Sequence, residues 1–182
     1  MHLQSAAMTG RFVRVAALLF LGACVHYQTT PLRKPYQGEE TGVVWGSKVE
    51  YLTPTQRVAY EITVRDGKLY TADGALLTTG RRGAIFVMTE EGRLYAAPDI
   101  DPGYFHHSSF VAGAPVAGAG ELYAKEGTLT EISDQSGHYE PGPEFTAQVL
   151  RRLRDLGVDL SQVVVRRISV GEYSAMDYLS DN

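Results

Sequence analysis

Three acid–glycine pairs, each followed two residues later by leucine, constrain the fold of this 182-residue chain more than any other feature. They are Asp66-Gly67, Glu91-Gly92 and Glu126-Gly127. Glycine readily adopts the positive φ that a tight hairpin turn requires, and the leucine can point the returning strand into a core. The pairs lie 25 and 35 residues apart, which is too uneven for a solenoid repeat. We therefore predict three β-hairpins that use the same turn chemistry.

The segments around these turns have the composition of β-strands. Residues 84–89 (AIFVMT) form a nearly continuous apolar run, which predicts a central strand covered on both faces. Thr53 and Gln56 have the spacing of a capping box, which predicts a short helical turn. Further strands are expected at 43–52, 59–64, 121–124, 128–132 and 163–170.

One amphipathic helix is expected near the C-terminus. Pro143 suits its first turn and Gly157 its end. Its apolar residues fall at steps of four, four and three: Phe145, Val149, Leu153 and Leu156. The predicted fold class is α+β, with predominantly antiparallel hairpins forming a sheet or partial barrel and this helix packed on it.

The N-terminus has the pattern of an export signal. Arg11 and Arg14 precede an apolar run at 15–23, which is about half the length that a membrane-spanning helix needs. The run ends in Leu21-Gly22-Ala23-Cys24, which resembles the lipobox of bacterial lipoproteins. The resemblance implies cleavage before Cys24 and lipidation of that residue, the only cysteine in the chain.

This interpretation divides the chain into four parts. Residues 1–23 are the removed signal peptide, 24–42 the lipidated cysteine and a flexible tether, 43–170 a single β-rich globular domain, and 171–182 an acidic tail. The expected location is the cell membrane or outer membrane, with the domain in the periplasm or on the cell surface. The net charge of −4 argues against nucleic acid as a partner, so attachment to the membrane would depend on the lipid.

Polar side chains concentrate in the middle of the chain. As a strand, 106–109 would alternate, with His106 and Ser108 on one face and His107 and Ser109 on the other. A His–Ser pair beside a carboxylate or a second histidine could supply base, nucleophile and orienting group. The catalytic candidates are His106, His107, Ser108, Ser109, Glu121 and His138.

The alternative is that these side chains only hydrogen-bond backbone across a loop-rich patch. Tyr139 and Ser136 are further candidates, for binding. We expect no metal, because no histidine or cysteine pair has ligand spacing, and no cofactor, because the glycines at 113–120 lack the ending of a phosphate loop.

The string FHHSSFVAGAPVAGAGEL, followed by a hairpin and SGHYEP, resembles the shared domain of plant IQ-motif-containing, calmodulin-binding (IQM) proteins. Similar segments occur at the C-terminal ends of large bacterial secreted proteins with toxin-like architecture. The resemblance covers roughly residues 84–160. No basic amphipathic helix lies between Cys24 and residue 84, so we expect no calmodulin binding.

Two function classes follow from these patterns. The first is a membrane-anchored bacterial envelope lipoprotein that displays a binding domain for an envelope protein or a small ligand. The second is an enzyme, a transferase or hydrolase acting on a nucleotide- or sugar-like substrate with the His/Ser/Glu cluster.

Overall fold

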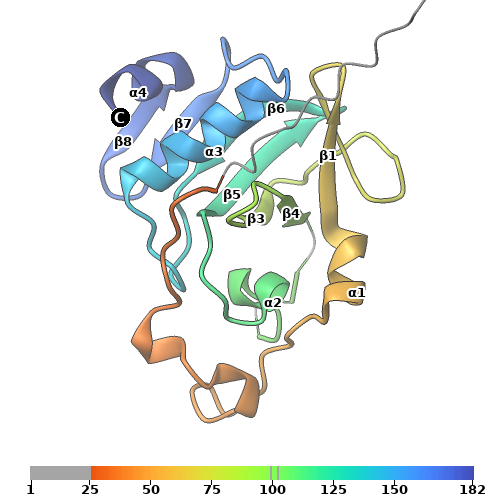
Figure 1. Cartoon of the computed structure of the whole chain (residues 1–182), viewed down its shortest axis with the longest axis vertical. Coiled ribbons are helices and arrows are strands. Elements are labelled where there is room, and N and C mark those ends of the chain that lie inside the picture. Colours follow the sequence, from red (N-terminus) through yellow and green to blue (C-terminus); the bar gives the residue numbers. More distant parts are fainter. Residues whose placement is uncertain (1–25, 99, 102) are drawn as a thin grey trace, which may run out of the picture.

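A single curled sheet organises the molecule (Figure 1). The computed structural model describes residues 26–98, 100–101 and 103–182. The strand order is β2-β1-β4-β3-β5-β6-β7-β8. The strands are β1 Glu61–Arg65, β2 Lys68–Tyr70, β3 Ala84–Met88, β4 Leu94–Ala97, β5 Gly118–Lys125, β6 Thr128–Ser133, β7 Val164–Arg167 and β8 Gly171–Ser174. The α+β class and the largely antiparallel sheet are confirmed.

All three acid–glycine pairs lie at hairpin turns. They join β1 to β2, β3 to β4, and β5 to β6, each as an antiparallel pair. Asp66 and Gly67 have φ values of 50° and 72°, and Glu126 and Gly127 have values of 48° and 74°. These left-handed conformations are the reason that each turn contains a glycine.

The helices are short except for one. They are α1 Pro54–Arg57, α2 His107–Val111, α3 Pro143–Asp155 and α4 Ala175–Asp181, with 3-10 turns at Lys34–Tyr36, Glu39–Thr41 and Val58–Tyr60. The predicted capping box is present at Thr53 and Gln56. Within the described ranges, none of these helices has the length and apolar character to cross a membrane.

Helix α3 covers one face of the sheet. It connects β6 to β7, which pair in parallel and therefore need a long crossover connection. Val149 and Leu153 of its predicted apolar stripe are buried in the core beneath it, together with Leu150, which the stripe did not include. Phe145 and Leu156 of the stripe are only half-buried. The sheet contributes Phe86, Met88, Leu94, Ala96, Leu122 and Ala124 to this core.

A second core lies on the opposite face. Ile85, Val87 and Ala119 of the central strands pack there with Phe110 and Val111 of α2. Leu32 and Leu52, from the chain before the first strand, join the same cluster. The central strand β3 is therefore covered on both sides, as its continuous apolar sequence predicts.

The segment expected to be a flexible tether packs on the domain instead. Thr30 forms an isolated bridge to Val116, and the Arg33 amide donates to the His138 carbonyl at 3.0 Å. Leu32 and Glu39 are buried. Residues 26–53, called here the N-terminal strap, run past α2 to α1 before the first strand begins (Figure 1), and Leu32 and Leu52 of the strap join the second core. The prolines did not prevent packing, because side chains and amides of the strap have partners in the domain.

Two predicted strands take other forms. Residues 43–52 form turns and extended chain, because their amides bond outside the sheet: the Glu50 amide donates to the Tyr104 carbonyl and the Leu52 amide to the Ser109 carbonyl of α2. Residues 107–111 form α2 and not an alternating strand. His106 is its N-cap, and its amide donates to the Ser109 hydroxyl at 3.0 Å. This local bonding favours the helical turn over a strand.

The C-terminal residues also differ from the expected tail. Residues 171–174 extend the sheet as β8, and α4 follows directly. Ala175 and Tyr178 are buried against the α3 side of the sheet, where the Tyr178 hydroxyl donates to the Pro143 carbonyl at 3.1 Å. The acidic composition of this segment gave no indication that Ala175 and Tyr178 are buried.

Close packing of α3 depends on a glycine in β5. A Cβ atom at Gly118 would lie 2.3 Å from Val149 Cγ2. We expect Gly118→Ala to lower the free energy of unfolding by about 1–3 kcal/mol through overpacking. Urea denaturation of Gly118→Ala, Val149→Ala and the double variant tests this contact. Alanine at position 149 should make room for the methyl group at position 118, so the double variant should lose less free energy of unfolding than the two single variants together. A loss equal to the sum of the two single losses would contradict this contact.

Candidate functional site

Glu39, on the N-terminal strap, is a fully buried carboxyl group. Its exposed fraction is 0%. Acidic side chains are almost never fully buried in proteins unless they are paired with specific partners. The 3-10 turn Glu39–Thr41 places it beneath the loop 134–142 and next to α2. A group in this position requires several donors to offset its lost hydration.

Four side chains meet the Glu39 carboxyl group. The hydroxyl of Ser108 donates to Oε1, and the Tyr51 hydroxyl lies 3.3 Å from the same oxygen. His138 Nε2 lies 2.9 Å from Oε2, and Trp45 Nε1 donates to that oxygen at 3.4 Å. Both oxygens are thus shared between the strap, α2 and the loop 134–142. Such a satisfied network holds its members in one arrangement.

Burial is the main cause that raises the pKa of the Tyr51 hydroxyl, and the nearby carboxyl groups of Glu39 and Glu40 add to the effect. The hydroxyl therefore keeps its proton at neutral pH and remains a donor to Glu39. A protonated phenol can donate where a phenolate can only accept, so the contact with Glu39 uses the protonated hydroxyl.

His138 is held in a stack of rings. The ring lies between Tyr36, at a centroid distance of 4.2 Å, and His106, at 4.4 Å. Tyr36 in turn stacks on Trp45 at 5.6 Å. Burial, and then the neighbouring His138, lower the pKa of His106, so this ring is mainly neutral at pH 7. The stack connects the buried carboxyl group to the surface through His106.

A cavity of about 220 Å³ opens at the outer end of this stack. It is lined by Trp45, Ser47, Gly103 and His106. Trp45 is 51% exposed, and His106 is half-buried. An aromatic face and a neutral imidazole thus border an opening backed by a fixed polar network, which is the usual character of a small-ligand site.

The other polar residues of α2 are buried and form hydrogen bonds inside the domain. His107 Nε2 lies 2.9 Å from the Gly120 carbonyl, and its ring is buried. Ser108 and Ser109 are 0% exposed. Ser108 is bonded to Glu39 and Ser109 to the His106 amide, so neither hydroxyl faces the cavity. The geometry of these residues therefore fits a structural role, in which they hydrogen-bond within the core, better than a catalytic role in which a serine acts as nucleophile.

Glu121 lies apart from this cluster. It lines a different cavity, between β5 and the loops at 80–83 and 98–100, and it accepts from the Tyr123 hydroxyl at 3.3 Å. The predicted combination of histidine, serine and Glu121 therefore does not meet in one place. The structure brings together His106, Ser108 and His138, with Glu39 as the carboxyl group between the last two.

The two binding candidates are buried. Tyr139 is 2% exposed, and its hydroxyl donates to the Ala114 carbonyl at 2.8 Å within the second core. Ser136 is 4% exposed, and its hydroxyl has no partner in the described part of the chain. Tyr139 is therefore a core residue, and Ser136 lies on the inner wall of a surface cavity at 134–141.

Sequence patterns missed the strap residues of the site: Tyr36, Glu39, Trp45 and Tyr51. The polar composition and prolines of 26–42 suggested a tether, which removed Glu39 from consideration. One signal was present within 26–42, since this segment contains the aromatic residues Tyr27 and Tyr36. Aromatic residues are depleted in flexible linkers. Trp45 and Tyr51 fell in the strand predicted at 43–52.

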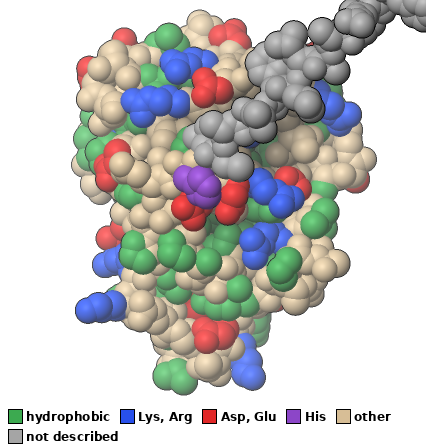
Figure 2. All heavy atoms as spheres, viewed as in Figure 1, with side chains coloured by type: hydrophobic (Ala, Val, Ile, Leu, Met, Phe, Trp, Pro, Cys, Tyr) green, Lys and Arg blue, Asp and Glu red, His purple; other side chains and the backbone are tan. Residues whose placement is uncertain are grey.

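Positively and negatively charged side chains are interspersed on the surface around these elements. On the face drawn in Figure 2, Lys and Arg side chains alternate with Asp and Glu, and hydrophobic side chains gather in the lower half. This face therefore presents no broad field of a single sign. Among residues 26–98, 100–101 and 103–182, no group of three or more His, Cys, Asp or Glu residues is placed to hold a metal ion.

Comparison with known proteins identifies the domain. Residues 56–145 match the family model of the IQ motif-containing protein middle domain. The chain carries an IQM-like domain. IQ domain-containing protein IQM3 of Arabidopsis thaliana is 37% identical over 139 residues, which cover 74% of this chain and 30% of the relative. IQM1 of the same plant is 37% identical over 136 residues, with 73% and 27% covered, and IQM5 is 34% identical over 122 residues, with 66% and 24% covered.

The IQM-like domain spans about 30% or less of the length of these relatives. The family match includes α2 and His138 but begins after Glu39, Trp45 and Tyr51. No solved structure matches this chain.

These relatives correct four expectations. They are plant IQ domain-containing proteins, which contradicts a bacterial envelope lipoprotein with a lipid anchor, a membrane as partner and an envelope protein as target. The exclusion of calmodulin is contradicted too, because the matched family is that of IQ motif-containing proteins. Cys24, on which the anchor rested, lies outside the described residues.

Burial of His107 makes stability depend on pH. Desolvation lowers the pKa of its imidazole from 6.5 to about 4, and the bond to the Gly120 carbonyl opposes this only in part. Between these values the unfolded chain binds a proton that the folded chain does not, so stability falls as the pH falls from 6.5 toward 4. The expected slope is up to about 1.4 kcal/mol per pH unit.

Urea denaturation of the IQM-like domain from about pH 7 to about pH 5 tests this slope. His107→Gln should flatten it, while His26→Gln, which alters an exposed histidine, should leave it unchanged. An equal slope in the wild type and His107→Gln would mean that other groups cause the pH dependence.

Proposed function

We propose that this IQM-like domain is a binding module for a small ligand with a planar, hydrogen-bonding ring. The observation that carries the proposal is the buried Glu39 carboxyl group, whose partners Trp45 and His138 lead to an open cavity. A network used only for packing would not need to end at a half-exposed tryptophan and a half-buried neutral histidine.

The chemistry of the lining defines the ligand class. The Trp45 ring offers a flat apolar face, and His106 offers one donor and one acceptor in its neutral form. The Ser47 hydroxyl, which donates to the Gly103 carbonyl at 3.3 Å, retains acceptor capacity. The volume of about 220 Å³ suits a single heterocycle, such as a nucleobase, better than a whole nucleotide.

Trp45 is itself one of the exposed large apolar side chains of the domain, with an exposed fraction of 51%. An exposed aromatic ring that lines a cavity is available to stack on a ligand. In this proposal the ring of the ligand stacks on Trp45, and its polar edge bonds to His106, whose position depends on the stack with His138.

Tryptophan fluorescence provides a direct test, because Trp45 is the only tryptophan in the chain. Adenine, guanine, cytosine and uracil are titrated, with ribose as a non-planar control. We expect at least one base to quench the fluorescence saturably, and His106→Ala to weaken its binding by at least about tenfold. His26→Ala, a histidine away from the cavity, should bind as the wild type does.

Two results would contradict this proposal. One is that none of the four bases changes the fluorescence of Trp45. The other is that the bases bind equally well to the wild type and to His106→Ala. Calorimetric titration of Trp45→Phe separates stacking from mere proximity, because phenylalanine keeps a smaller aromatic face.

We also propose calmodulin as a partner, on the basis of the IQM-like sequence. The helix best suited to an acidic protein is α3, which carries Arg151, Arg152 and Arg154. Its apolar stripe is buried against the sheet, so calmodulin would contact only the basic side, and we expect weak affinity.

Titration with calmodulin, with and without Ca²⁺, tests this partner. Arg151→Glu combined with Arg154→Glu should weaken binding at least about tenfold, because two attractive charges become repulsive. Lys34→Glu combined with Lys125→Glu is the charge-matched control and should bind as the wild type does. Absence of binding by the full chain, or equal binding by both double variants, would contradict the proposal.

A further inference from the structure

A second cavity, of about 290 Å³, lies on the sheet face opposite α3. Its floor is one row of directly opposed residues on three neighbouring strands: Ala97 on β4, Ile85 on β3 and Glu121 on β5. Opposed residues in antiparallel strands project side chains about 5 Å apart from the same face. The floor therefore consists of two apolar side chains followed by one carboxyl group.

The second core covers only part of this face. Phe110 and Val111 of α2 pack over Val87 and Ala119, which form the next row of the same face. The row that holds Ile85 is instead flanked by loops, with Gly80, Arg81, Arg82 and Gly83 on one side and Pro98 and Ile100 on the other. The cavity is the gap that α2 leaves uncovered.

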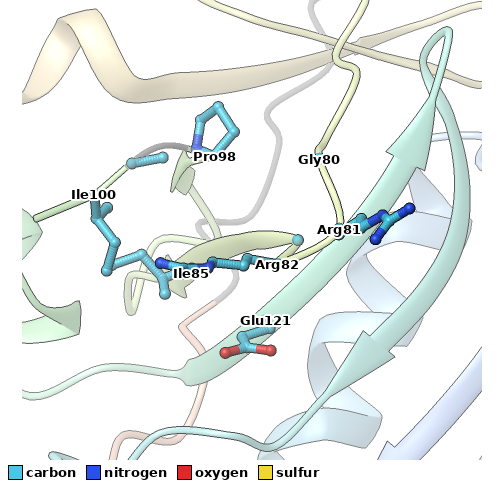
Figure 3. A pocket seen from close by; sticks show the side chains of 9 residues that line it. Gly80, Arg81, Arg82, Ile85, Pro98, Ile100 and Glu121 are labelled. Carbon is cyan, nitrogen blue, oxygen red and sulfur yellow. The ribbon is translucent and has the colours of Figure 1, made fainter. Parts of the chain in front are cut away.

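A tight fit fixes the loop that carries the arginines. Gly83 has a φ of 69°, and a Cβ atom there would lie 2.8 Å from the Tyr123 ring. The chain at 80–83 therefore rests directly on β5, beside Glu121. Figure 3 shows the Arg81 and Arg82 side chains pointing in opposite directions, with Arg82 toward Ile85 and Ile100.

The carboxyl group of Glu121 is held close to this floor. It is half-buried and accepts from the Tyr123 hydroxyl at 3.3 Å. Burial raises the pKa of Glu121, and the bond from Tyr123 and the positive charge of Arg166 oppose that shift. A cationic group in the cavity would offset the cost of burying this carboxyl group.

We infer that this cavity binds a free α-amino acid with an apolar side chain. The guanidinium of Arg82 is placed for the carboxylate of the ligand, and the carboxyl group of Glu121 for its ammonium group. Ile85, Ala97, Pro98 and Ile100 form the apolar surface against which the ligand's side chain packs. One cationic and one anionic side chain beside an apolar floor match the two charged groups and one apolar group of such a molecule.

The size and position of the cavity favour this ligand over larger ones. A volume of about 290 Å³ lies at the lower end of the range for ligand pockets. A neighbouring hollow of about 190 Å³ shares Ala97 and Ile100 and reaches Phe105, so a longer apolar side chain has room to extend. The inference does not depend on the site at Trp45, since the two cavities have no lining residue in common.

The experiment is a calorimetric titration of the full chain with L-phenylalanine, L-leucine and L-isoleucine. Two analogues of phenylalanine separate the charges: 3-phenylpropionate lacks the ammonium group, and 2-phenylethylamine lacks the carboxylate. We expect at least one amino acid to bind, and the loss of either charged group to weaken binding of phenylalanine-like ligands at least about tenfold.

Variants assign the binding to the cavity. Arg82→Gln should weaken binding of the amino acid at least about tenfold, and Glu121→Gln should do the same. Arg65→Gln and Glu90→Gln, which change exposed residues elsewhere, should bind as the wild type does. Thermal unfolding of each variant checks that its fold is intact.

Three outcomes would overturn the inference: no binding by any of the three amino acids, binding by Arg82→Gln or Glu121→Gln that equals binding by the wild type, or binding of the analogues that lack a charge that equals binding of phenylalanine. Trp45 fluorescence distinguishes this inference from the proposed function. Amino acid binding should leave that fluorescence unchanged, because Trp45 lines the other cavity.

Discussion

The buried carboxyl group of Glu39 is the interaction on which the rest of the site depends. It lies in a segment before the first strand, yet its partners come from α2 and from the loop after β6. Leaving any one of these donors unpaired would cost about 1–3 kcal/mol. The N-terminal strap therefore packs as an integral layer of the domain, and the aromatic rings that it carries become part of the candidate site.

The sheet supplies the framework for both candidate sites. Helix α3 seals one face, where Gly118 allows close approach to Val149. The other face is covered unevenly by α2 and the strap, which leaves one opening near Trp45 and another above Ile85. The family match to the IQM middle domain covers strands β1 to β6 and α2, whereas Glu39 and Trp45 precede it and β7 and β8 follow it. The site thus combines a family-typical sheet with groups from outside the matched region.

Local patterns predicted the hairpins, the capping box and α3, because turns and amphipathic stripes depend on neighbouring residues. They failed where long-range contacts decide the structure. Glu39 and His138 are 99 residues apart, and no local signal could pair them. The tail at 171–182 is ordered for a similar reason, since β8 needs β7 as its partner. Of the predicted site, His106, Ser108 and His138 do gather, whereas Glu121 faces another cavity because register on β5 determines its position.

Hydrogen exchange of the strap amides tests the central role of Glu39 most directly. Thr30, Arg33 and Val49 each donate a backbone hydrogen bond within the folded strap layer, so they should be protected in the wild type. Glu39→Ala should remove this protection while the amides of β3 and β5 keep theirs, and Glu40→Ala, at an exposed neighbour, should change neither. Equal protection of the strap amides in Glu39→Ala and the wild type would contradict this account.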